Sequence, residues 1–121
     1  MDIQTEFDPE SRIGTLTLRG ACGTEDAAGL ALALRELTDA VAQARAKADA
    51  AAGGQPWTAA LDMSGLAAVG MAFFEVVFAA SLVLARQGTA LVRRGEQPEC
   101  VRQAAKLTGF CAAPGLSGLF A

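Results

Sequence analysis

The sequence predicts one α/β domain with layered architecture and a partly parallel sheet. The chain order is strand, strand, helix, strand, helix, strand, helix, and strands that alternate with helices favour parallel pairing. The composition agrees, because 121 residues that are 52% hydrophobic can bury one core. A net charge of −3 is too small for a disordered chain of this hydrophobicity.

The first 50 residues predict a β-hairpin followed by a long helix. Residues 3–8 alternate apolar and polar side chains, a second β-rich run covers 13–18, and turn residues join the two. Thr24 is the expected N-cap of the helix. Apolar residues then recur at helical spacing: Leu30, Leu34, Leu37 and Val41. We expect about six turns, ending in a loop at 50–56.

Three further segments continue the alternation. Residues 57–63 form a short apolar run that suits a strand buried on both faces. A helix is expected from Met71 to Arg86, because Gly88 stands where a glycine commonly ends a helix. Residues 89–92 are expected to form another core strand.

The C-terminal part predicts one more helix and a tail. Pro98 can open a helix over 99–107, and Gly109 ends it. Four residues of this helix are expected to face the core: Val101, Ala104, Ala105 and Leu107. The tail at 112–121 shows no period. It is expected either to pack Leu116, Leu119 and Phe120 onto the sheet or to stay loose.

One segment also has the length of a membrane span. Residues 66–85 are mostly apolar, and their only charge is Glu75. A central carboxylate is costly in a bilayer, and Gly70 interrupts the run, which leaves a helix too short to span comfortably. We therefore favour a buried helix in a layered fold and expect no membrane insertion.

The composition narrows the possible functions. The chain has no histidine and no tyrosine, so the commonest general base and metal ligand are missing. We expect a non-enzymatic protein without metal or cofactor. The acidic balance and the lack of a basic cluster exclude a nucleic-acid surface.

The cysteines and the N-terminus bear on the compartment. Cys22, Cys100 and Cys111 fit no zinc spacing, which favours three free thiols, although a bridge between Cys100 and Cys111 is an alternative. The N-terminus lacks the basic and apolar regions of a signal peptide. We therefore expect a cytoplasmic protein.

Three segments in order resemble the STAS family, the anti-sigma-factor antagonists. Residues 14–37 are similar to the family's opening strand, loop and first helix. Residues 61–77 resemble its central pattern, with Asp62, Ser64 and Gly65 matching Asp-x-Ser-Gly. Residues 104–110 resemble its closing helix, which often ends in Leu-Thr-Gly.

The resemblance covers about 12–111 and implies a mixed sheet of about four to five strands, with helices mainly on one face. The whole chain, 1–121, is expected to be one such domain, with 112–121 as its tail.

The resemblance also implies docking onto a protein partner through the start of the second helix. The expected contact residues are Ser64, Gly65, Gly70, Met71, Ala72, Phe73 and Glu75. Where many family members carry Asp-Ser-Ser-Gly, this chain has Gly70, Met71, Ala72 and Phe73. In phosphoswitch members one of those serines accepts phosphate, so the usual switch is not expected here.

Each of these residues also has a plainer interpretation. Met71, Phe73 and Glu75 either contact a partner or pack within the domain, because a helix that is apolar all round must be covered. Ser64 either bonds the local backbone at the carboxyl end of its strand or meets a ligand there. A catalytic role for Glu75 is disfavoured.

The expected function is therefore a cytoplasmic interaction module of bacterial signalling. Its partner would be a kinase, an anti-sigma factor or a chemotaxis-like signalling protein. Alternatives are an accessory subunit of a membrane transport assembly, or a small-ligand or nucleotide-binding domain. An exposed apolar helix could also be covered in a homodimer.

Overall fold

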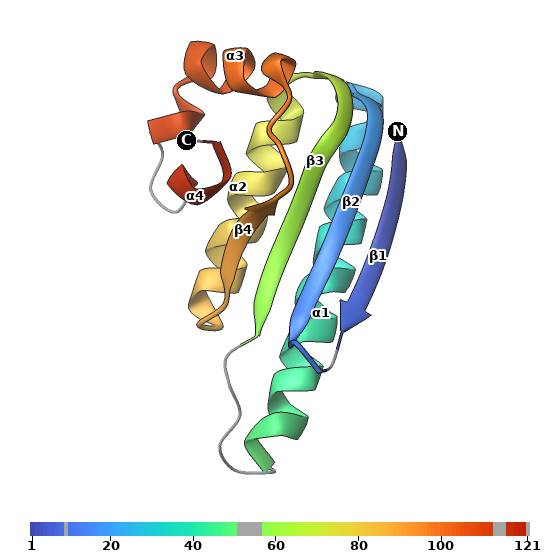
Figure 1. Ribbon diagram of the computed structural model, residues 1–121, viewed down its shortest axis with the longest axis vertical. Helices are drawn as coiled ribbons and strands as arrows, with labels where there is room; N and C mark the ends of the chain where they lie inside the picture. Colours follow the sequence, from blue (N-terminus) through green and yellow to red (C-terminus); the bar gives the residue numbers. More distant parts are fainter. Residues whose placement is uncertain (9, 51–56, 113–115, 121) are drawn as a thin grey trace.

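The computed structural model describes residues 1–8, 10–50, 57–112 and 116–120. A four-stranded sheet forms its centre, in the spatial order β1 (Asp2–Asp8), β2 (Ile13–Cys22), β3 (Thr58–Val69) and β4 (Ala90–Arg94). β1 pairs antiparallel with β2, whereas β2, β3 and β4 are parallel (Figure 1). The predicted α/β class, N-terminal hairpin and mixed sheet are confirmed.

The two long helices lie side by side on one face of the sheet (Figure 1). They are α1 (Ala27–Ala50), which packs on β2, and α2 (Met71–Arg86), which packs on β4. α3 (Glu99–Thr108) contacts β3 at the end of the sheet where α2 begins. The short η2 (Phe110–Ala112) and α4 (Ser117–Phe120) then return the chain to β4.

The core lies between the sheet and the helix pair. Large apolar side chains of β2 and β3 alternate toward the helices and are fully buried: Leu16, Leu18, Leu61 and Met63. α1 contributes the predicted stripe, because Leu30, Leu34, Leu37 and Val41 are all at most 2% exposed. On the opposite face the Arg94 guanidinium donates to the Thr15 hydroxyl, with Nη1 3.1 Å from Oγ1.

Two of the element boundaries that differ from the prediction lie near the candidate site. β3 does not end at residue 63 but continues to Val69, because β2 pairs with it as far as Cys22. The helix predicted from Thr24 begins at Ala27 instead. A 3-10 turn, η1 (Thr24–Asp26), precedes it, since the Asp26 carboxylate accepts the Gly23 N–H at 3.0 Å and holds a tighter turn there.

The predicted inward position of Leu107 is wrong. Its side chain is 88% exposed, whereas Val101 and Ala105 of the same helix are fully buried. α3 ends at Gly109, whose φ of 80° terminates the helix, and Phe110 beyond it packs against the core.

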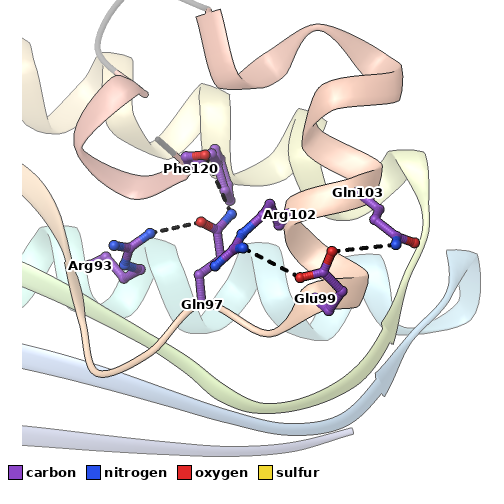
Figure 2. Close-up of polar contacts among 6 residues, drawn as sticks. All are labelled: Arg93, Gln97, Glu99, Arg102, Gln103 and Phe120. Atoms are coloured by element: carbon purple, nitrogen blue, oxygen red, sulfur yellow. Dashed lines mark hydrogen bonds and ion pairs between the residues drawn. The ribbon is translucent and has the colours of Figure 1, made fainter.

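The three apolar tail residues named in the prediction pack into the core, in agreement with the first of the two expectations. Leu116 and Leu119 are fully buried and Phe120 is 2% exposed. Two hydrogen bonds hold this segment, one from β4 and one from the loop that follows it. Arg93 Nη1 donates to the Leu119 carbonyl at 3.2 Å, and Gln97 Nε2 donates to the Phe120 carbonyl at 3.5 Å. Figure 2 shows Gln97 between Arg93 and Phe120, with the Glu99–Arg102 ion pair of α3 beside them.

Three smaller expectations concern the loop, the thiols and the membrane alternative. From residue 51 on, the loop predicted at 50–56 lies outside the described residues. Cys22, Cys100 and Cys111 are free thiols, without the alternative bridge. Within the described ranges, none of the helices combines the length and hydrophobicity of a bilayer span.

Candidate partner-binding surface

The first turn of α2 is fixed to the end of the sheet. The Gly70 N–H donates to the Cys22 carbonyl of β2 at 3.0 Å, and the Phe73 N–H donates to the Gly70 carbonyl at 3.2 Å. Gly70 is the N-cap and no side chain caps the helix. The backbone therefore positions this turn, and the side chains of Met71 and Ala72 are not used to close it.

Met71 and Glu75 point outward from this first part of α2. The Met71 side chain is 52% exposed. Glu75 is exposed and Ala72 is half-buried. The sequence left the orientation of Met71 and Glu75 open, and the structure makes both available to a partner.

Phe73 is not available to a partner, so its assignment as a contact residue is wrong. Its side chain is fully buried, as is that of Phe74. The Phe73 ring packs edge-on to Phe74 and Phe120, with centroids 5.2 and 6.3 Å apart. The aromatic pair at the start of α2 is thus part of the core.

Ser64 and Gly65 are not adjacent to this turn along the chain. Both are exposed, but they lie inside β3, and about 20 Å of extended strand separates Ser64 from Gly70. The Ser64 hydroxyl donates to Asp62 Oδ1 at 2.6 Å, and the Ser64 N–H donates to the same oxygen at 3.0 Å. Pairing between β3 and β4 stops at Asp62, so this local motif marks the end of the parallel ladder.

Gly65 has a packing role in the sheet. A Cβ at this position would approach Arg19 Cγ to 2.7 Å and the Leu18 carbonyl oxygen to 3.1 Å. A larger residue here would require the Arg19 side chain and the β2 backbone to shift, so glycine suits this close approach of β2 and β3.

The turn η1 adjoins the start of α2. It was not part of the candidate site predicted from the sequence. η1 contacts α2, and its Thr24 and Glu25 are exposed. The sequence signal at this place is the acidic pair Glu25-Asp26 that follows Thr24. We call the combined patch of Gly70, Met71, Ala72, Glu75, Thr24 and Glu25 the leading-turn surface.

The chemistry of this surface is simple. Its ionisable groups are carboxylates, and the described residues contain no group of histidine, cysteine or acidic side chains that could hold a metal. The thiol below it, Cys22, is buried, and burial followed by the nearby Asp26 carboxylate raises its pKa. The arrangement offers an apolar side chain within an acidic rim, which suits contact with a protein.

Comparison with known proteins bears on the fold. No protein-family model matches the sequence, and no curated protein matches it. A solved structure does match: the crystal structure of an anti-sigma factor antagonist from Mycobacterium paratuberculosis. The two align with a TM-score of 0.61 and 20% sequence identity, over 92% of this chain and 81% of the other.

The chain has the STAS-like fold of an anti-sigma factor antagonist. The expected architecture is thereby confirmed: a mixed four-stranded sheet with α1 and α2 on one face. Within the STAS-like fold, the leading-turn surface lies at the end of the sheet where β2 and β3 end and α1 and α2 begin (Figure 1).

Proposed function

We propose that this protein is a non-enzymatic interaction module of a regulatory circuit, which docks onto a protein partner through the leading-turn surface. The observation that supports this most directly is the contrast within one helical turn. Met71 is 52% exposed while Phe73 and Phe74 are fully buried. A helix anchored by two buried rings presents a flexible thioether in a fixed place, and methionine adapts well to a partner surface.

The solved structure with this fold is an anti-sigma factor antagonist, and the partner class follows from that likeness. We infer that the partner is a kinase or an anti-sigma factor, with a chemotaxis-like signalling protein as a further member of the same class. A role of this kind implies a cytoplasmic location and needs no cofactor.

Docking in this proposal is not released by phosphorylation at the leading turn. Gly70, Met71 and Ala72 carry no hydroxyl group, so no phosphate ester can form there. Regulation in this proposal therefore does not act through phosphorylation of these three residues. Ser64 and Gly65 enter the contact only if the partner also covers the middle of β3.

Site-specific cross-linking in the native cell tests the proposal. A photo-reactive amino acid replaces Met71 in one variant and Val92 in a control variant. Val92 is also apolar and 36% exposed, but it lies on β4 next to the inward-facing Leu91 and so points to the other face of the sheet.

The expected result is a covalent adduct at position 71, and not at 92, with a protein that carries a kinase-type ATPase or an anti-sigma domain. Equal adducts at both positions, or none at 71, would contradict the proposal. An adduct with a permease subunit would instead support the transport-assembly alternative.

A further inference from the structure

The outward face of α2 carries a second, separate pattern. Four residues spaced by four, three and four positions lie on the helix face opposite the core: Glu75, Ala79, Leu82 and Arg86. All four are exposed, whereas the residues that face the sheet, among them Val77 and Leu84, are fully buried. This spacing forms one straight stripe along a helix and is the spacing of a two-helix seam.

The middle of the stripe is apolar. The Leu82 and Val83 side chains are 45% and 43% exposed. Ala79, together with Val76 and Val83, lines a groove of about 400 Å³ between α1 and α2. A small residue beside a protruding leucine leaves room for the leucine of another helix.

The two ends of the stripe carry opposite charges. Glu75 and Arg86 are exposed, and neither forms an ion pair or hydrogen bond within the described part of the chain. They are eleven residues apart, about 16 Å along the helix axis, so they cannot pair with each other.

These charges fit a second copy of the same helix, and they fit it in one orientation. A two-fold axis passing between Ala80 and Ser81 has Glu75 and Arg86 at equal distances on either side. Ala79 and Leu82 are likewise equidistant from that axis. An antiparallel partner helix therefore sets Glu75 against Arg86, Leu82 against Ala79, and the same pairs again by symmetry.

We propose that α2 of one chain packs antiparallel on α2 of a second chain, making an isologous homodimer with Glu75 paired to Arg86 of the other copy. A parallel arrangement is disfavoured, because it sets like charges opposite each other at both ends. The seam is only as long as a helix of 16 residues, so the dimer is reversible and depends on concentration.

This inference goes beyond the proposed docking function and does not rest on it. Met71 lies one turn before Glu75, outside the outermost pair of the seam, and remains at the edge of the dimer. Glu75 belongs to both surfaces, so a partner that needs Glu75 competes with the dimer.

Charge exchange in the full chain tests the proposal by sedimentation velocity over a range of concentrations. Glu75→Lys and Arg86→Glu are made singly and together. Each single change creates two like-charge contacts by symmetry, so each should weaken the dimer about tenfold or more. Glu6→Lys changes the net charge as Glu75→Lys does, but on exposed β1, and should leave the dimer unchanged.

The decisive sample is an equimolar mixture of the two single variants. In that mixture the lysine introduced at position 75 of one chain meets the glutamate introduced at position 86 of the other. The unchanged Arg86 of the first chain meets the unchanged Glu75 of the second, so a heterodimer should form where each variant alone is monomeric. The double variant should dimerise like the natural chain. A monomeric natural chain, as expected if a different protein covers this face, would overturn the proposal, as would a mixture that stays monomeric.

Discussion

Phe74 of α2 stacks on Phe110, with ring centroids 5.4 Å apart and ring planes 11° from parallel. Phe120 packs against Phe74 as well, at 5.2 Å. These rings join the second helix to the segments that follow α3, so the C-terminal residues hold the start of α2 in place. The exposure of Met71 depends on this anchor.

Removing one ring from the cluster of Phe74, Phe110 and Phe120 should cause a large loss of stability. Phe120→Ala should lower the free energy of unfolding by about 3 kcal/mol, because it leaves a cavity against two buried rings. Urea unfolding followed by circular dichroism measures the change. Leu107→Ala, at an 88% exposed position, is the matched control and should change stability by less than about 0.5 kcal/mol. Equal effects would show that the tail is not part of the core.

Two glycines should respond to alanine with opposite signs. Gly95 has a φ of 82°, and a Cβ there would lie 3.3 Å from Asp62 Oδ1, so Gly95→Ala should destabilise the fold by about 1 kcal/mol. Gly29 lies in α1, and a Cβ added there would meet no other atom within 4 Å, so Gly29→Ala should stabilise by about 0.5–1 kcal/mol. Thermal denaturation of both variants decides the point. A stabilised Gly95→Ala variant would contradict the backbone described for Gly95, and a destabilised Gly29→Ala variant would contradict the open space described at Gly29.

Cys22 should be the slowest cysteine to be alkylated. Burial, and then the charge of Asp26, raises the pKa of its thiol. The thiolate is the reactive form, so a raised pKa moves the onset of labelling to higher pH. Iodoacetamide labelling across a pH series, read by peptide mass spectrometry, should show this delay relative to Cys111.

Asp26→Asn removes the negative charge near Cys22 and tests whether the Asp26 carboxylate contributes to the raised pKa of the thiol. The labelling profile of Cys22 should move to lower pH, while that of Cys111 stays where it was. A Cys22 profile that moves to higher pH in this variant would contradict the electrostatic contribution of Asp26.

Local patterns sufficed for the fold but not for the orientation of single residues. The order of strands and helices followed from hydrophobic periodicity, and α2 begins at Met71 and ends at Arg86, as predicted. Phe73 and Leu107 were misplaced for a different reason. Phe73 is buried partly by Phe120, which is distant in the sequence. The position of Leu107 depends on where α3 ends, which is set by the single positive φ angle of Gly109.

The candidate site shows the same division. The resemblance pointed to the start of α2, and the exposure of Met71 and Glu75 agrees with that position. The resemblance also grouped Ser64 with this turn, because a strand ending at residue 63 would have placed them in one loop. Pairing between β2 and β3 as far as Cys22 and Val69 keeps the chain extended instead. η1 lies beside the start of α2 because β2 and β3 end at the same edge of the sheet, and the sequence alone does not give this register.

The most direct test of the proposed docking surface is the affinity of Met71→Glu for the protein that cross-links at position 71. A glutamate in the first turn of a helix is compatible with the fold, because the helix dipole stabilises a negative charge there. Calorimetric titration should show binding weakened about tenfold or more, as expected for a central apolar contact, while Val92→Glu binds like the natural chain. Unchanged affinity of the folded Met71→Glu variant would contradict the account.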